Sequence, residues 1–171
     1  RYLNAIMPFA KYYNDLKQSR YTPISLLVTG EAGTGKTGLT DYLRPALVYL
    51  QSTPEHTLIY DNTMAYTYNS SQDYWSGYAK QQFVMIDDIF QSTLDEDRAR
   101  ESRAVVNMMN TATFALDMAD VESKGKVHFD SPYLFMTTNI ANRGMAECEL
   151  NVKMQDKNAF WRRCNLAVHA I

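Results

Sequence analysis

The sequence of 171 residues contains few metal-binding or disulfide-forming side chains. It has two cysteines, Cys148 and Cys164, and three histidines, His56, His128 and His169. Two cysteines cannot form a disulfide framework or a four-ligand zinc site by themselves, and the histidines are scattered along the chain. We therefore expect reduced thiols, as in a cytosolic protein, and we assign no metal-binding role to the histidines.

Long apolar runs and an excess of positive charge are also missing. No stretch approaches the roughly 20 apolar residues that cross a bilayer, and no secretory signal pattern is present. Lys and Arg number 17 against 19 Asp and Glu, so the net charge is −2. Without a global basic field, any contact with nucleic acid must come from a local patch. Because the sequence begins with Arg1, we expect a piece of a larger protein.

The overall composition is that of an ordinary globular domain, with 46% hydrophobic and 21% charged residues. The length suits a single domain with a substantial core. We expect this core domain over residues 20–171, preceded by a flanking helix over residues 1–19, where apolar residues recur at helical spacing. This helix fits packing on the domain flank. A membrane-surface helix is the less favoured alternative because cationic residues are few.

The strongest local signal is the segment Gly30-Glu31-Ala32-Gly33-Thr34-Gly35-Lys36-Thr37. It matches the phosphate-binding pattern G-x-x-x-x-G-K-[ST] at every fixed position. An apolar run at Ile24–Val28 precedes it and a helix-compatible stretch follows, which is the context that the pattern requires. Loop amides and the helix N-terminus would bind phosphates. Lys36 would pair with the β- and γ-phosphates, and the Thr37 hydroxyl would ligate Mg²⁺.

Short apolar runs alternate with helix-compatible stretches along the chain, a pattern typical of an α/β domain with a mainly parallel, five-stranded sheet. We expect strands at 24–28, 57–60, 82–86, 133–137 and 166–171. We expect a helix at 36–43, which Pro45 would kink or end, with 46–50 as a possible second half. We expect another helix at 98–113, capped by the acids at 95–97. The segment Lys124-Gly125-Lys126 predicts a tight turn between short strands.

Polar residues follow several of these strands at the carboxyl edge, where open α/β sheets bind ligands. Asp87 and Asp88 follow the third expected strand and Asn139 follows the fourth. Asp87 would hold Mg²⁺ together with Thr37, Asp88 would orient or activate a water, and Asn139 would polarise the same water. Adjacent strand residues point to opposite faces, so the two acids cannot do the same job unless the strand ends there. The plain alternative is that the acids end a buried strand and that Asn139 is a turn residue.

Three segments in this order carry a family resemblance: Gly30–Thr37, Gln82-Phe83-Val84-Met85-Ile86-Asp87-Asp88 and Phe135-Met136-Thr137-Thr138-Asn139. They resemble motifs A, B and C of superfamily 3 helicases, and more closely those of the 2C-like NTPases of picorna-like positive-strand RNA viruses. Asp73-Tyr74-Trp75-Ser76-Gly77-Tyr78 resembles the approach to motif B. Glu122-Ser123-Lys124-Gly125 resembles the segment between motifs B and C. The resemblance covers about residues 20–171.

The resemblance implies an AAA+-type, three-layer P-loop fold that hydrolyses ATP with Mg²⁺ in a hexameric ring. Arg162-Arg163 resembles the arginine-finger pair, so one of the two would reach the γ-phosphate held by a neighbouring subunit. Lys124 and Lys126 would face the ring's pore and contact single-stranded RNA. Without the resemblance, the arginines fit a solvated pair before an edge strand and the lysines fit a solvated hairpin tip.

The resemblance also implies a setting for the activity: viral RNA replication in the host cytoplasm, at membrane-associated sites, with other viral replication proteins as partners. Membrane attachment would come from regions outside this chain. Two other functions stay open. One is a nucleotide-dependent assembly or scaffolding ATPase, or an RNA chaperone, without true unwinding. The other is a small-molecule kinase, which Asp87, Asp88 and Asn139 disfavour because they suit activation of water.

Overall fold

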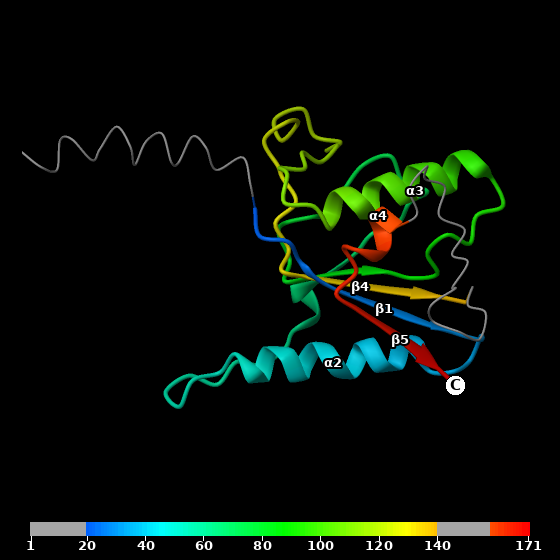
Figure 1. Cartoon of the computed structure of the whole chain (residues 1–171). Coiled ribbons are helices and arrows are strands. Elements are labelled where there is room, and N and C mark those ends of the chain that lie inside the picture. The colour runs from blue at the N-terminus through cyan, green and yellow to red at the C-terminus, as the bar shows by residue number, and fades with distance from the viewer. Residues whose placement is uncertain (1–19, 140–157) are drawn as a thin grey trace, which may run out of the picture.

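The computed structural model describes residues 20–139 and 158–171 (Figure 1). The helix expected over residues 1–19 lies outside the described residues, and so does Cys148.

Five strands form one sheet in the order β2-β3-β4-β1-β5, and every pairing between neighbours is parallel. The strands are β1 (Ile24–Gly30), β2 (Ala65–Thr67), β3 (Phe83–Ile86), β4 (Tyr133–Thr138) and β5 (Leu166–Ala170). The predicted fold class is therefore confirmed. The polar segments after β1, β3 and β4 emerge at one edge of the sheet, because parallel strands end on the same side.

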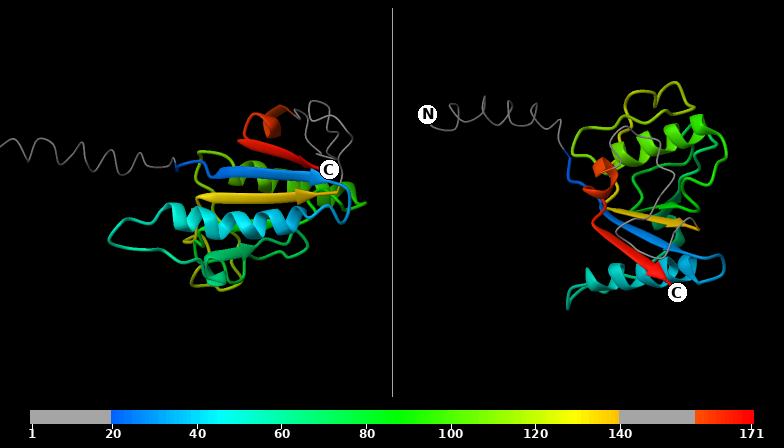
Figure 2. Two further views of the ribbon diagram at one scale, coloured as in Figure 1. Left: turned by 90° about the horizontal axis from the view of Figure 1, so that it is seen from below. Right: turned by 45° about the vertical axis from the view of Figure 1, so that its right-hand side comes forward.

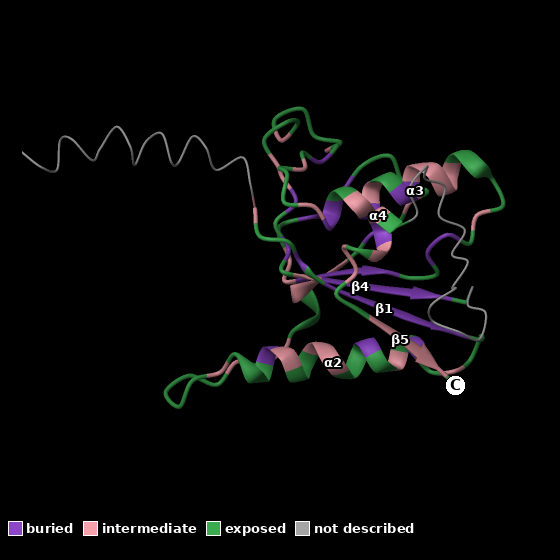
Figure 3. Cartoon of the chain, in the orientation of Figure 1, coloured by how far each residue is buried: buried purple, intermediate pink, exposed green. Residues whose placement is uncertain are grey.

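Helices cover both faces of the sheet and complete three layers (Figures 1 and 2). Helix α2 (Lys36–Leu50) lies on one face, whereas α3 (Asp95–Met108) and α4 (Asn158–Trp161) lie on the other. Alternation along β1 accounts for this arrangement: Leu26 packs in the cluster on the α2 side, and Leu27 packs in the cluster on the α3 side. Figure 3 shows that the central strands are buried along most of their length.

The expected strand at 57–60 is wrong, because those residues have no regular structure. The second strand is β2 instead, and it follows a short 3-10 helix, η1 (Asn62–Met64). Leu58 and Tyr60 pack partly buried against the α2-side cluster, and the Leu58 amide donates to the Ser52 hydroxyl at 2.8 Å. The apolar run therefore reflects burial of a loop, which periodicity cannot distinguish from a short strand.

Two helix boundaries also differ from those expected. Helix α2 runs through Pro45 without ending, because Pro45 is exposed and the opposite side of the helix packs on the sheet. Helix α3 begins at Asp95 rather than after the acids, and it ends at Met108 rather than near residue 113. At its C-terminus the Arg20 guanidinium donates to the carbonyls of Asn107 and Met108 at 2.6 and 2.5 Å. These bonds satisfy carbonyls that the end of a helix leaves unpaired.

The segment at 73–78, which resembles the approach to motif B, packs into the protein core. Trp75 and Tyr78 are buried, and the Tyr78 ring stacks on Phe129 at 6.0 Å. The Tyr78 hydroxyl lies 2.9 Å from the Ser131 hydroxyl and accepts from the Asp130 amide, and burial raises its pKa. These contacts join the chain before β3 to the chain before β4, and so fix where both strands start.

The short strands expected on either side of Lys124-Gly125-Lys126 are not formed. A single antiparallel bridge, Ala115 with His128, joins the two sides of the loop, and residues 121–126 are turns.

Within the described residues, no helix combines the length and apolar character needed to cross a bilayer.

Candidate functional site

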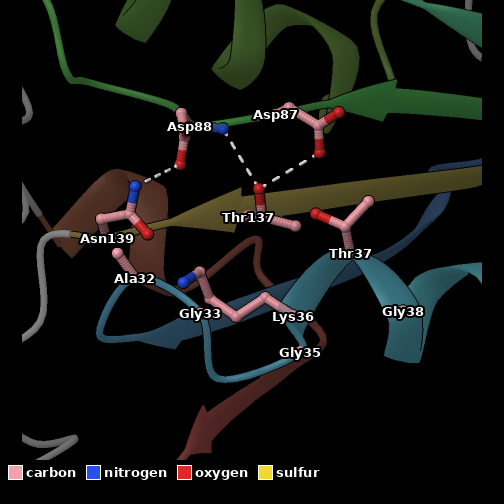
Figure 4. A pocket seen from close by; sticks show the side chains of 10 residues that line it. All are labelled: Ala32, Gly33, Gly35, Lys36, Thr37, Gly38, Asp87, Asp88, Thr137 and Asn139. Atoms are coloured by element: carbon pink, nitrogen blue, oxygen red, sulfur yellow. Dashed lines mark hydrogen bonds between the residues drawn. The ribbon is translucent and has the colours of Figure 1, made fainter.

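The phosphate-loop segment connects β1 to α2 and lines one side of a cavity (Figure 4). Gly30 is required by space: a β-carbon there would lie 2.6 Å from the Ala170 carbonyl oxygen and 2.9 Å from the Thr34 hydroxyl. Gly35 is the N-cap of α2 with φ 79, a left-handed conformation that favours glycine. No side chain caps this helix. Its first amides are thus left to bind an anion.

Lys36 is held inside the loop. The residue is 7% exposed, and Nζ donates to the carbonyl oxygens of Gly30 at 3.1 Å and Glu31 at 2.7 Å. An ammonium has three donors, so these two bonds leave capacity for a phosphate oxygen. The loop thus supplies a positive charge at a fixed place beside the N-terminus of α2.

The two acids lie on the opposite side of the same cavity, which has a volume of about 500 Å³. Strand β3 ends at Ile86, and Asp88 adopts a left-handed φ of 50. The alternation expected for adjacent strand residues therefore does not apply, and both carboxylates line one cavity (Figure 4). Its lining residues are Ala32, Gly33, Gly35, Lys36, Thr37, Gly38, Asp87, Asp88, Thr137 and Asn139.

Two residues of the β4 end fix these acids. The Thr137 hydroxyl donates to Asp87 Oδ1 at 3.3 Å and accepts from the Asp88 amide at 3.1 Å. Asn139 Nδ2 donates to Asp88 Oδ1 at 2.8 Å. The predicted neighbours Asp88 and Asn139 are therefore in direct contact, across the pairing of Ile86 with Met136.

Sequence reasoning missed Thr137. It lies within a segment quoted for its resemblance to motif C, but only Asn139 received a role. A signal was present, because Thr137 is a polar residue near the end of an apolar strand that pairs with the strand carrying the acids. Its 2% exposure and its two hydrogen bonds explain why a hydroxyl is needed there.

The cavity contains donors that suit Mg²⁺. The Thr37 hydroxyl and the Asp87 carboxylate are hard oxygen donors, and both line it. Within residues 20–139 and 158–171, no group of three or more His, Cys, Asp or Glu side chains is arranged to hold a metal ion. This limited donor set fits Mg²⁺, which commonly binds through one or two protein ligands, substrate phosphates and waters, and not through an all-protein cage.

The predicted arginines lie far from this cavity. The Arg163 carbonyl accepts from the Ser25 hydroxyl at 3.0 Å, which places it beside the start of β1. Gly30 is five residues further along β1, or about 17 Å at 3.3 Å per residue. Arg162 is exposed, and Arg163 is half-buried with Nη1 donating to the Ala159 carbonyl. The segment precedes β5, which is an edge strand as expected.

The predicted RNA-binding lysines form a separate exposed region. Lys124 and Lys126 are exposed in the turns at residues 121–126, where Gly125 has a φ of 74. Figure 1 shows this loop away from the carboxyl edge of the sheet, where the cavity lies. Asp120 and Glu122 lie in the same loop, so its charge is mixed.

The family comparison agrees with this geometry. The family model described as RNA helicase matches residues 26–140, which include both sides of the cavity from Gly30 to Asn139. The chain belongs to this family. Together with the viral relatives described next, this match confirms the resemblance to 2C-like superfamily 3 helicases, and the chain is a helicase/NTPase domain.

Viral polyproteins are among the relatives of this helicase domain. It is 30% identical over 149 residues to the RNA1 polyprotein of Cowpea mosaic virus (strain SB), covering 87% of this chain and 7% of the polyprotein. It is 29% identical over 158 residues to the genome polyprotein of Rice tungro spherical virus (strain A), covering 91% and 4%. It is 31% identical over 129 residues to the genome polyprotein of Human hepatitis A virus genotype IA (isolate GBM), covering 75% and 5%. The chain therefore spans less than a tenth of these relatives' length.

Proposed function

We propose that this helicase domain hydrolyses ATP with Mg²⁺ in the cavity between the phosphate loop and the ends of β3 and β4, and uses the energy to remodel single-stranded RNA. The main support is that Lys36 lines one side of this cavity, and the hydrogen-bonded pair Asp88 and Asn139 lines the opposite side. Phosphoryl transfer to water requires a cation for the phosphates and a group that orients the water. The cavity contains both.

Each wall residue has a distinct task in this proposal. The loop amides and Lys36 bind the β- and γ-phosphates and hold the γ-phosphate toward the acids. Mg²⁺, held by Thr37 and Asp87, would supply charge neutralisation on the phosphates. Asn139 holds Asp88 Oδ1, which aims the carboxylate so that its second oxygen accepts a hydrogen bond from the attacking water. Thr137 keeps the two acids at a fixed separation.

The proposal is tested by measuring Mg²⁺-dependent ATP hydrolysis with and without single-stranded RNA, and displacement of one strand from an RNA duplex. We expect hydrolysis that single-stranded RNA stimulates, together with displacement. Absence of Mg²⁺-dependent hydrolysis at high protein concentration, in a polypeptide that carries the flanking regions, would overturn it. Hydrolysis without displacement would instead support the second candidate, a scaffolding ATPase or an RNA chaperone. The mixed charge of the Lys124–Lys126 loop favours scaffolding, because acidic side chains weaken contact with RNA phosphates.

We also propose that hydrolysis takes place between subunits of a ring, hexameric in the full-length protein. The support is the separation of about 17 Å, along β1, between the level of Arg163 and that of Gly30, because an arginine side chain cannot span it. Arg162 or Arg163 would instead supply the finger to a neighbour's γ-phosphate, a contribution of about 10³-fold or more. Lys124 and Lys126 would contact RNA in the pore.

Mixing two inactive variants tests the ring. Lys36→Ala subunits mixed with Arg162→Ala/Arg163→Ala subunits should regain part of the activity, since some sites then pair an intact loop with an intact finger. Specific activity of the unmodified protein should also rise with concentration. If assembled mixtures recover nothing and specific activity is flat, the arginines do not act on a neighbour.

The viral relatives support a setting for this activity. We propose that the domain acts in the host cytoplasm, at membrane-associated replication sites, together with other viral replication proteins. Membrane attachment would be supplied by polypeptide outside this chain. The proposed division into a flanking helix at 1–19 and a core at 20–171 can be checked by whether a polypeptide beginning at residue 20 unfolds cooperatively.

A further inference from the structure

The turn that carries Asp88 has an unusual backbone. Asp88 has a φ of 50 and Phe90 a φ of 63, both in the left-handed region that residues other than glycine rarely adopt. Such conformations persist when the surrounding structure fixes them. On one side, β4 does so: the Asp88 amide donates to the Thr137 hydroxyl, and the Ile89 amide donates to the Thr137 carbonyl at 2.9 Å.

The third amide of this turn is bound from the opposite side. The Phe90 amide donates to Glu101 Oε2 at 2.7 Å, and Glu101 lies on α3 with 5% exposure. Burial raises the pKa of the Glu101 carboxyl, whereas hydrogen bonds from the Phe90 amide and the Ser70 hydroxyl lower it. A buried carboxylate is costly unless hydrogen bonds compensate it. Its presence among the buried residues of α3 therefore calls for a role.

Glu101 does not line the cavity between the phosphate loop and the strand ends, but it is placed to influence that cavity through the turn. It borders a second cavity of about 350 Å³, which Asp87 and Asp88 also line. Phe90 is further fixed through its ring, which packs edge-on against Phe160 with centroids 5.8 Å apart. The turn is therefore held at Asp88 and Ile89 by β4, and at Phe90 by α3 and α4.

We propose that Glu101 is a positioning residue for ATP hydrolysis: by binding the Phe90 amide it fixes the turn, and thereby the direction of the Asp88 carboxylate. This inference rests on the proposed role of Asp88. Only two peptide units separate Asp88 from the Phe90 amide. Without the hydrogen bond from the Phe90 amide to Glu101, the left-handed φ angles of the turn would relax. The Asp88 carboxylate would then change its direction relative to Asn139.

Three variants test this role in the same polypeptide that is used for the ATPase assay. Glu101→Leu keeps the side chain's size but leaves the Phe90 amide without its acceptor. Glu101→Gln keeps a carbonyl oxygen for the Phe90 amide, and its amide group can donate to the Ser70 hydroxyl. Val105→Ala is the matched control, because it removes buried volume from the same helix without removing a hydrogen bond from the turn.

We expect Glu101→Leu to lower kcat by about tenfold to a hundredfold with KM for ATP little changed, since misplacement by about 1 Å can cost on the order of 10²-fold. Glu101→Gln should restore kcat to within a few-fold of the unmodified protein. Tm is measured for all three, so that Val105→Ala shows what loss of stability alone does to kcat. The proposal is overturned if Glu101→Leu has the kcat of the unmodified protein, or if Glu101→Gln is as slow as Glu101→Leu. It is also overturned if Val105→Ala, at an equal loss of Tm, has a kcat as low as that of Glu101→Leu.

Failure of this inference is separable from failure of the proposed function. If Asp88→Asn abolishes hydrolysis while Glu101→Leu does not affect it, the function stands and the positioning role falls. If Asp88→Asn hydrolyses ATP normally, the proposed role of Asp88 falls, and the role of Glu101 falls with it.

Discussion

The two walls of the cavity are built in different ways. The loop wall, Gly30–Thr37, is a run of consecutive residues, and the hydrogen bonds from its Lys36 ammonium reach back only five and six residues. The strand wall consists of Asp87, Asp88, Thr137 and Asn139, and its hydrogen bonds join residues 49 to 51 positions apart. The loop wall therefore depends on local sequence, whereas the strand wall depends on the register between β3 and β4.

This difference implies a division of labour. The loop wall offers amides, an ammonium and a helix N-terminus, all of which attract phosphate whether or not hydrolysis follows. The strand wall offers two carboxylates, which repel phosphate oxygens but suit metal and water, and an amide that donates to one of them. Changes in the first should affect binding and hydrolysis together, and changes in the second should separate them.

The largest effect is expected from Lys36→Ala in the loop wall. In the proposed mechanism, removal of the ammonium takes away a cation that contacts phosphate both before and during the reaction. Hydrolysis should fall by about 10³-fold or more, and nucleotide affinity should fall as well. The measurements are the rate of phosphate release and the Kd of a fluorescent ATP analogue. Near-normal turnover would remove the central role assigned to this wall.

The next largest effect is expected from Asp88→Asn in the strand wall. Loss of the group that orients water should lower kcat by about 10²- to 10⁴-fold while Mg-ATP still binds. Asp87→Asn is the matched variant, and it should also weaken the dependence of nucleotide binding on Mg²⁺. Binding titrations at several Mg²⁺ concentrations distinguish them. An equal loss of Mg²⁺-dependent binding in both variants would contradict the separate roles.

A smaller effect is expected from Thr137→Val, which keeps the shape of the side chain but removes its hydroxyl. Each of the two lost hydrogen bonds contributes about 0.5–1.5 kcal/mol net, so kcat should fall by about tenfold. Thr137→Ser retains the hydroxyl and should stay close to the unmodified protein. Steady-state kinetics on the pair provide the check. If valine and serine give the same kcat, the hydroxyl does not hold the acids in place.

Sequence alone predicted a phosphate-loop segment between a strand and a helix, and the structure has this arrangement, because the pattern lies within the eight residues Gly30–Thr37. Gly30 is the exception, since its space is limited by the distant Ala170. The sequence also predicted that the polar ends of the strands meet, since parallel strands share an edge. It allowed for the strand to end before Asp87 and Asp88, but it could not show that both carboxylates line one cavity, because that depends on the left-handed turn. Glu101 escaped notice for the same reason: its partner is a backbone amide, which leaves no trace in the side-chain pattern.

The errors in secondary structure have a related cause. The 57–60 run has the composition of a strand but packs as a loop, and the true strand, Ala65–Thr67, is too short to show alternation. The helix over Asp95–Met108 ends where Arg20 binds its last carbonyls, a contact between residues 87 and 88 positions apart. Both outcomes are decided by tertiary contacts, which a local pattern does not contain.

The smallest effect is expected outside both walls, at Lys124 and Lys126. Substitution of both by alanine should weaken RNA binding while basal ATP hydrolysis stays unchanged, because their loop lies away from the cavity. Each phosphate contact on a single strand contributes about 0.7 to the slope of log affinity against log salt, so the slope should fall by up to about 1.4. Lys80→Ala is the control, since Lys80 is exposed but its ammonium lies 3.2 Å from the Asp130 carboxylate. Binding of a labelled single-stranded RNA at several salt concentrations measures affinity and slope together. If the double variant keeps both values of the unmodified protein, the two lysines are solvated residues of a turn, and RNA contacts lie elsewhere.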